Sequence, residues 1–172
     1  MDIPYNIEHW RLIDGYDNYE VSSHGRVRNN RTNKILKGGE NNAGYFFVCL
    51  YKNGKVKNCL IHRLVAFAFV PNDKNKPMVD HINRDTKNNH MSNLRWCTNS
   101  ENQANTVKKE GTTSNYKGVY FHKRDQLYIA RIRHNGPKIQ IGYFKNEKDA
   151  ALAYNKKAIE IFGEFAKLNI IE

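Results

Sequence analysis

Short apolar stretches separated by turn residues make up the first third of the chain. Between residues 8 and 37 apolar and polar positions alternate over short distances, which is typical of short β-strands with little helix. Residues 45–51 form a longer apolar run, and Asn53-Gly54 after it is a strong hairpin signal. We therefore expect a β-rich N-terminal region followed by a hairpin whose return strand covers residues 55–61.

The pattern changes at residues 62–70, where apolar residues recur at helical spacing and Pro71 follows. This predicts a short buried helix. His62 at its start can either bind a partner or serve in capping and packing, and the second interpretation is favoured. The segments expected next are a loop (72–77), a short strand (78–81), a polar loop (82–92), a strand (94–97) and a helix within residues 98–109, capped by Thr98 or Asn99.

A polar segment of small residues, 108–115, fits a linker between this region and the C-terminal part. Three strand-like pieces follow it, and then a helix that Asn146 caps and Gly163 ends. Alternation gives the middle strand one apolar face, which the helix can cover, and one basic face that stays open. The apolar positions are Ala130 and Ile132, and the basic positions are Arg131 and Arg133.

The 172 residues carry a formal net charge of +11, which favours a polyanionic partner such as nucleic acid over a merely solvated surface. Cys49, Cys59 and Cys97 form no C-x-x-C pair, so neither a structural zinc site nor a disulfide framework is expected. Buried thiols in a reducing cytoplasm are the better explanation. No apolar run is long enough to span a bilayer, and the first ten residues lack the pattern of a secretion signal.

An asparagine-rich segment, residues 78–105, begins with adjacent Asp80 and His81. Phosphodiester hydrolysis needs a base for the attacking water and a cation with hard oxygen ligands to stabilise the developing charge. Histidine suits the proton transfer, and an amide oxygen can fix its tautomer without adding charge. Adjacent strand residues face opposite sides, so Asp80 and His81 can share a site only at a strand end or bulge. Asn93 can lie across from His81, and Asn102 falls in the first turns of the next helix.

This ordered spacing, around Asn93-Leu94-Arg95-Trp96 and after His62-Arg63-Leu64-Val65-Ala66, resembles the HNH nuclease family with its ββα-metal core. The most similar branch is that of the phage and intron-encoded homing endonucleases. The resemblance implies that Asp80 and Asn102 hold one divalent metal ion, Mg²⁺ or Mn²⁺, that His81 is the general base, and that Asn93 orients it. The C-x-x-C zinc pair of many HNH proteins is absent, as in this branch.

Other polar residues of the segment have simpler explanations. Asn88 and Asn89 suit Asx turns in the polar loop. His90 is an alternative base, but it lies in the middle of the loop without a carboxylate neighbour, which favours a solvated side chain.

Residues 8–37 resemble the small nuclease-associated modular DNA-binding motif that precedes HNH domains. Trp10, Ile13-x-Gly15-Tyr16, Tyr19-x-Val21-Ser22 and Gly25-x-Val27 carry this likeness, although the aromatic and valine side chains also suit an ordinary core. If the module grips duplex DNA, its phosphate contacts are Arg26, Arg28, Arg31 and Lys34.

Residues 114–169 resemble the ethylene-response-factor (Apetala-type) DNA-binding domain, which lays a three-stranded sheet in the major groove with one helix behind it. The likeness rests on Tyr116-Lys117-Gly118-Val119, on residues 128–133 and 141–144, and on Lys167-Leu168-Asn169. Arg131 and Gln140 replace residues of the plant pattern, and Tyr120 stands at a usually basic position, so plant-type base specificity is not carried over. The candidate DNA contacts are Lys117, His122, Arg131, Arg133, Lys138 and Gln140.

The sequence thus predicts an α+β protein with a small β-rich N-terminal module, a central ββα-metal HNH core and a C-terminal three-stranded antiparallel sheet packed on one helix. The expected domains are residues 1–40, 41–107 (core about 78–107) and 116–172, with the linker at 108–115. The expected function is a site-specific, metal-dependent DNA endonuclease of homing type that nicks one strand.

We expect this enzyme to bind double-stranded DNA as a monomer, without a membrane, in the cytoplasm of a bacterial host infected by the phage that encodes it. The alternative function is a DNA-binding regulator with a catalytically degenerate HNH core. RNA binding is disfavoured because the sequence shows no clear aromatic platform for unpaired bases.

Overall fold

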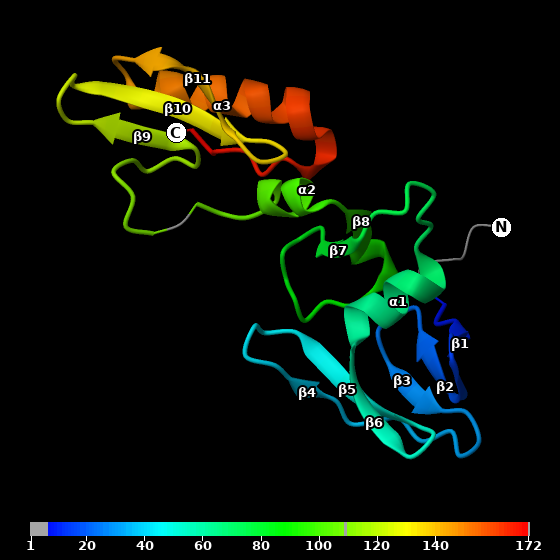
Figure 1. Cartoon of the computed structure of the whole chain (residues 1–172). Coiled ribbons are helices and arrows are strands. Elements are labelled where there is room, and N and C mark those ends of the chain that lie inside the picture. Colours follow the sequence, from blue (N-terminus) through cyan, green and yellow to red (C-terminus); the bar gives the residue numbers. More distant parts are fainter. Residues whose placement is uncertain (1–6, 109, 172) are drawn as a thin grey trace. The chain divides into compact units, whose positions relative to one another are not determined.

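A computed structural model of the chain describes residues 7–108 and 110–171, which form two compact units, Met1–Cys97 and Thr98–Glu172 (Figure 1). The first unit contains, in chain order, β1 (Trp10–Ile13), β2 (Tyr16–Ser22), β3 (Val27–Asn29), β4 (Gly39–Glu40), β5 (Phe46–Lys52), β6 (Lys55–Leu60), α1 (Ile61–Phe69), β7 (Met78–His81), the 3₁₀ turn η1 (Met91–Asn93) and β8 (Leu94–Cys97). The second contains α2 (Asn99–Ala104), β9 (Val119–His122), β10 (Leu127–Arg133), β11 (Lys138–Phe144), α3 (Glu147–Phe162) and η2 (Gly163–Phe165).

From residue 7 onward, the first unit contains three small antiparallel sheets, with strand orders β1-β2-β3, β4-β5-β6 and β7-β8. The hairpin between β5 and β6 turns at Asn53 and Gly54, which both have positive φ (50° and 76°), as the sequence predicted. α1 contacts strands of all three sheets (Figure 1). Val65 and Ala66 on this helix have no solvent exposure, so one apolar core joins the N-terminal strands to the β7–β8 pair.

The β7–β8 pair carries the asparagine-rich segment. Its register is regular, with Asp80 opposite Arg95 and His81 opposite Leu94, and β7 ends at His81. The two neighbouring acid and imidazole side chains therefore stand at a strand end, which is one of the two arrangements that the sequence allowed. Thr98 caps α2 together with Glu101 in a capping box.

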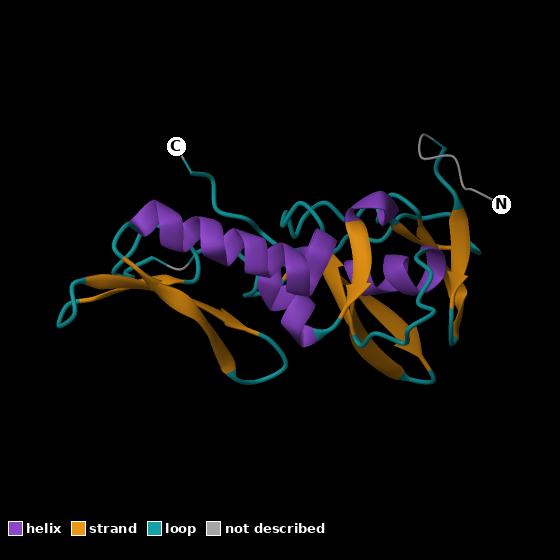
Figure 2. Cartoon of the chain, turned by 90° about the horizontal axis from the view of Figure 1, so that it is seen from above, coloured by secondary structure: helices purple, strands orange, loops and turns teal. Residues whose placement is uncertain are grey.

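In the second unit, α3 lies along one face of the β9–β10–β11 sheet, with β10 in the centre (Figure 2). Ala130, Ala150 and Ala151 are fully buried between helix and sheet, because small side chains let the two layers approach closely. Asn146 caps α3 by accepting from the Lys148 N–H at 2.8 Å, and Gly163 follows its last turn. The expected mixed α+β architecture, with small sheets and few helices, is confirmed.

Two details differ from the sequence-based expectation. α2 ends at Ala104 and is shorter than the polar pattern predicted, and the boundary between the units falls between Cys97 and Thr98, before the expected linker at 108–115. The functional domains proposed from the sequence stay a prediction. Within the parts of the chain that the structure describes, no helix is long and apolar enough to cross a membrane.

Candidate active site

Asp80 is nearly buried, with 6% of its surface exposed, and its charge is met by a cross-strand partner. Arg95 on β8 donates to Asp80 Oδ2 from Nε at 3.0 Å and from Nη2 at 2.9 Å. A carboxylate removed from water needs such a partner, because an unpaired buried charge is strongly unfavourable. The ion pair therefore fixes the orientation of the carboxylate at the end of β7.

His81 is also buried, and its imidazole contacts an amide. The Nε2 atom lies 3.1 Å from Oδ1 of Asn89, and the Nδ2 atom of Asn89 donates to the Lys87 carbonyl at 3.4 Å. The second bond fixes which end of the Asn89 amide faces the ring, since only nitrogen can donate to a carbonyl. Oδ1 can only accept, so Nε2 of the neutral imidazole carries the hydrogen and Nδ1 carries the lone pair.

The amide on this imidazole is not the one that the family resemblance implied. We expected Asn93 to orient His81 and Asn89 to serve a turn. Asn93 instead accepts from the Asn83 N–H at 3.0 Å and donates to the Asn88 carbonyl at 2.8 Å. Backbone groups of the polar loop need partners, and Asn93 at the base of the loop satisfies two of them, so it ties the loop closed.

The two neighbouring asparagines of the loop thus differ in role. Asn88 accepts from the His90 N–H at 3.3 Å in the expected turn, whereas Asn89 is buried against His81. Nothing in the sequence distinguishes them, because both lie in the same polar loop. Only the fold of the loop decides which one reaches the ring.

The rings of His62 and Tyr45 also pack on His81, and the sequence had indicated a packing role only for His62. His62 lies 5.1 Å from His81 between ring centroids, and Tyr45 lies 4.9 Å from His62 and 5.9 Å from His81. Burial lowers the pKa of His62 to about 4, helped by the charges of His81 and Arg63, so this imidazole is neutral at neutral pH. Leu60, not His62, is the N-cap residue of α1, so His62 packs on these rings and does not cap the helix.

The donors that the sequence proposes, Asp80 and Asn102, carry oxygen atoms of the kind that a divalent cation prefers. Among the residues described, no three His, Cys, Asp or Glu side chains form a cluster that could hold a metal. Asp80 would need amide, water or phosphate oxygens beside it, and Mg²⁺ commonly takes one or two carboxylates together with substrate phosphates. Asn102, the proposed amide donor, lies on α2 in the second unit, so its pairing with Asp80 rests on the resemblance to the HNH family.

Two of the four expected DNA contacts in the N-terminal module have internal partners. Arg26 bonds to Glu8, and Arg28 donates to Glu20 at 2.7 Å. Both guanidinium groups also lie over the Trp10 ring, at 5.6 and 4.2 Å from its centroid. The remaining two, Arg31 and Lys34, are exposed.

The open face of the C-terminal sheet carries most of the remaining candidates. Arg131 stands opposite Gln140 and Arg133 opposite Lys138, and directly opposite residues share a face. Arg133, Lys138 and Gln140 are exposed, and Arg131 is half-buried. The predicted basic face is therefore present on β10 and β11.

The sheet also carries two features that the sequence did not predict. On the open face, Tyr120 and Tyr143 both stand opposite Ile129 and are 39% and 56% exposed, so two exposed tyrosines flank this isoleucine. An irregularity in the β10–β11 register adds Ile141 between the partners of Ala130 and Arg131.

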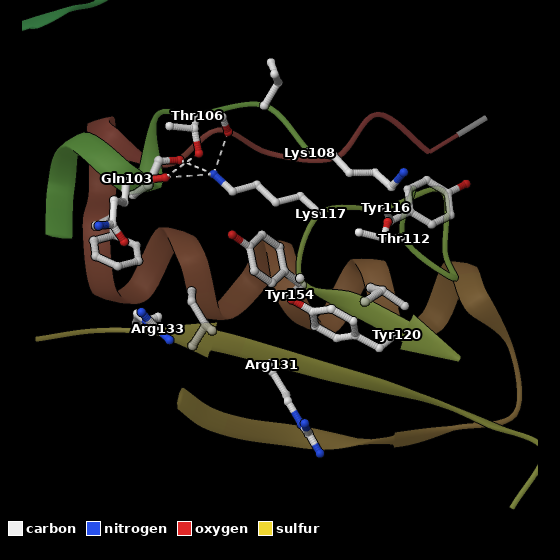
Figure 3. A pocket seen from close by; sticks show the side chains of 16 residues that line it. Gln103, Thr106, Lys108, Thr112, Tyr116, Lys117, Tyr120, Arg131, Arg133 and Tyr154 are labelled. Atoms are coloured by element: carbon white, nitrogen blue, oxygen red, sulfur yellow. Dashed lines mark hydrogen bonds between the residues drawn. The ribbon is translucent and has the colours of Figure 1, made fainter. Parts of the chain in front are cut away.

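The other two candidates of the second unit are engaged locally. The ammonium group of Lys117, expected on DNA, donates to the carbonyls of Ala104 and Thr106, each at 2.6 Å, and so holds the end of α2 (Figure 3). His122 is exposed, with Nδ1 3.1 Å from Asp125 Oδ2.

A cavity of about 240 Å³ opens beside Lys117 (Figure 3). Its lining includes Tyr154, whose pKa burial raises to about 12, with a smaller contribution from Tyr120. The ring of Tyr154 packs so closely on Gly118 that a Cβ there would lie 2.2 Å from it. None of the four motif residues lines this cavity.

The sequence patterns of two protein families match the first unit and the first residues of the second unit. Residues 8–51 match the NUMOD4 motif, and residues 59–104 match the HNH endonuclease family. The second range contains Asp80, His81, Asn93 and Asn102. Together with a relative that is similar over most of both chains, these matches show that the chain belongs to the HNH endonuclease family.

That relative is the DNA endonuclease I-HmuI of Bacillus phage SP01, which is 34% identical over 141 residues, covering 81% of this chain and 76% of the relative. The solved structure of the HNH homing endonuclease I-HmuI matches with a TM-score of 0.53 at 28% identity, covering 90% of this chain and 83% of that one. The uncharacterized HNH endonuclease L245 of Acanthamoeba polyphaga mimivirus is 38% identical over 96 residues, 56% of this chain. The chain spans only 29% of the length of L245.

Proposed function

We propose that this chain is a site-specific DNA endonuclease of homing type, which hydrolyses a phosphodiester bond with a divalent metal ion and nicks one strand. The observation that carries the proposal is the buried imidazole of His81, held by an amide oxygen at a strand end beside the Asp80–Arg95 pair. The similarity to I-HmuI, whose solved structure concerns DNA binding and cleavage, supports the same conclusion.

His81 acts as the general base in this proposal. The Nε2–H bond to Asn89 leaves the lone pair on Nδ1, where it can accept a proton from the attacking water. Asn93 supports this role through the loop, which it closes by bonding to Asn83 and Asn88. An imidazole with fixed tautomer and orientation needs little rearrangement when the water loses its proton.

Asp80 and Asn102 are the proposed ligands of one Mg²⁺ or Mn²⁺ ion. When bound, the ion would stabilise the negative charge that develops on the phosphoryl and leaving oxygens. Arg95 holds Asp80 in place from the neighbouring strand, as outer partners of metal-binding carboxylates commonly do. The products expected from the family resemblance are a 3′-hydroxyl and a 5′-phosphate.

The proposed partner is double-stranded DNA, bound by one copy of the chain. The charge of +11 and the basic face of the β9–β10–β11 sheet support this proposal. We propose that this sheet enters the major groove in the manner of the ethylene-response-factor family, with Arg131, Arg133, Lys138 and Gln140 toward the bases and phosphates. Arg31 and Lys34 are the proposed phosphate contacts of the N-terminal module, with Arg26, Arg28 and His122 in supporting positions.

One catalytic set in each chain favours cleavage of one strand in each binding event. Cutting both strands would require a second copy or a second binding event. We further propose that the protein is phage-encoded and acts in the cytoplasm of a bacterial host, which the phage origin of I-HmuI supports.

The proposal is tested by sequencing the ends produced from a library of target DNA, with Mg²⁺ and with a chelator. The expected result is a set of 5′-phosphate ends at one sequence on one strand, present only with the metal. Tight and sequence-selective binding without any new ends, under both conditions, would instead identify the chain as a DNA-binding regulator with an inactive HNH core.

A further inference from the structure

We propose that the N-terminal module positions the catalytic imidazole as well as contributing to DNA binding. In this inference the turn at residues 22–25 holds Asn89 at the place from which it orients His81. The inference rests on the proposed nuclease function of His81, and it assigns Gly25 and Asn89 a positioning role in that reaction.

The turn is rigid because buried serine side chains satisfy its backbone. Ser22 Oγ accepts from the Arg26 N–H at 2.9 Å, and Ser23 Oγ accepts from the His9 N–H at 3.1 Å. The Ser23 N–H donates to the His9 carbonyl at 2.8 Å. Ser22 and Ser23 are 0% and 1% exposed, so this turn forms a fixed edge of the module.

The same edge packs directly on the loop that follows β7. The Met91 N–H donates to the Ser23 carbonyl at 2.8 Å, and the rings of His24 and His90 lie 4.8 Å apart between centroids. At the same edge, Gly25 packs against Asn89 with no room for a side chain. A Cβ at position 25 would lie 2.7 Å from Asn89 Cβ and 3.2 Å from its carbonyl oxygen.

This close packing limits which residues position 25 can hold. Its φ of +86° already favours glycine, and the atoms that a side chain would meet are the backbone and Cβ of Asn89, which cannot rotate away. Any side chain at position 25 must therefore displace either the turn or Asn89. Asn89 is 6% exposed, and its Oδ1 lies 3.1 Å from His81 Nε2, so a displacement of about 0.5 Å weakens the bond that sets the tautomer.

The test compares Gly25→Asn with Gly15→Asn in the full chain. Gly15 belongs to the same module and has a similar φ of +72°, but a Cβ there would meet only the flexible end of Lys52, at 3.6 Å. Asparagine tolerates positive φ better than most residues. Both variants carry a similar backbone strain, so a difference between them reports the displacement of Asn89 by the new side chain. A thermal melt of each variant reports whether it is folded at the assay temperature.

The first measurement is the single-turnover cleavage rate of DNA fully bound by each variant. Gly25→Asn is expected to lower this rate by about 10- to 100-fold with DNA affinity within about twofold, and Gly15→Asn to leave both unchanged. Asn89→Ala is expected to lower the rate similarly. When Gly25→Asn is combined with Asn89→Ala, the rate is expected to fall by less than about a further twofold. Normal cleavage by folded Gly25→Asn, or full additivity with Asn89→Ala, would overturn the proposal.

The second measurement does not depend on cleavage. In ¹⁵N-labelled protein without DNA or metal, the ring nitrogens of His81 are expected to show the Nε2–H tautomer in the unmodified chain and in Gly15→Asn, and to lose this signature in Asn89→Ala and Gly25→Asn. An unchanged signature in folded Gly25→Asn would reject the positioning role. If the signature changes as expected but no variant cleaves DNA, the nuclease assignment fails and the structural coupling stands.

Discussion

The guanidinium group of Arg95 donates from both Nε and Nη2 to one oxygen of Asp80, at 3.0 and 2.9 Å. The two residues stand directly opposite each other on β7 and β8, and both side chains are largely buried. This pair connects the proposed metal ligand to the strand that leads into α2. Its removal is therefore expected to affect both the stability of the first unit and the proposed chemistry.

Arg95→Met keeps much of the side-chain volume but leaves the Asp80 carboxylate buried without this partner. We expect the free energy of unfolding of the first unit to fall by about 3 kcal/mol, as for other broken buried ion pairs. Urea unfolding followed by tryptophan fluorescence measures this change, because Trp10 and Trp96 both lie in the first unit. Arg31→Met is the control, because that side chain is exposed, and it should change stability by less than about 0.5 kcal/mol. Equal effects of the two substitutions would contradict the structural role of the pair.

The ion pair between Glu8 and Arg26 is expected to make a second contribution to stability, which is lost at acidic pH. Chiefly the hydrogen bond from Arg26 lowers the pKa of Glu8 from 4.5 to about 2. A lowered carboxyl pKa contributes stability that is present above pH 4.5 and is lost as the pH falls from 4.5 to 2. The effect is expected to be modest, because Arg26 is 56% exposed and solvent screens the pair. Glu8→Gln should remove this part of the stability profile, and a profile identical to that of the unmodified chain would show that the pair contributes nothing.

Protonation of His62 is expected to lower the stability of the fold at a higher pH than protonation of Glu8 does. Burial lowers its pKa from 6.5 to about 4, so the folded chain favours the neutral ring. The resulting stability is fully present above pH 6.5 and is lost as the pH falls from 6.5 to 4, by about 3 kcal/mol in total. His62→Phe keeps a ring against Tyr45 and His81 without a titrating group, and should flatten the profile of unfolding free energy in this range. His122→Phe is the control at an exposed position, and it should leave the profile steep.

Two lysines of the second unit are predicted to separate DNA binding from stability. Lys138 is exposed on the basic face, so Lys138→Ala should reduce the slope of log K against log salt concentration by about 0.9. Lys117 is committed to carbonyls at the end of α2, so Lys117→Ala should lower stability by about 1 kcal/mol and leave that slope unchanged. Salt titrations of DNA binding and thermal melts of both variants measure the two quantities. A reduced slope for Lys117→Ala would contradict its assignment as a purely structural residue.

Local signals in the sequence predicted much of the fold. Asn53-Gly54 set the β5–β6 hairpin, Asn146 and Gly163 bounded α3, and Asp80-His81 fell at a strand end. These features depend on neighbours within a few residues, where turn geometry, capping and alternation act directly.

The contacts that the sequence did not reveal share one physical cause. The partners of Lys117 and Arg26, the packing of Tyr45 on His81, and the choice of Asn89 over Asn93 all depend on contacts between segments that the chain brings together only when folded. Residue type shows that an arginine can meet DNA or an amide can meet an imidazole. It does not show which of several equivalent side chains lies within reach.

The central claim is that His81 activates the water that hydrolyses DNA at a metal-dependent site. Its most direct test is the nicking rate of a supercoiled plasmid that carries the target sequence found in the library experiment, measured with Mg²⁺ under single-turnover conditions. His81→Ala is expected to bind this DNA with unchanged affinity and to nick it at least 10²-fold more slowly, whereas His90→Ala should lose no more than a fewfold. Nicking by His81→Ala at the rate of the unmodified chain would contradict the account.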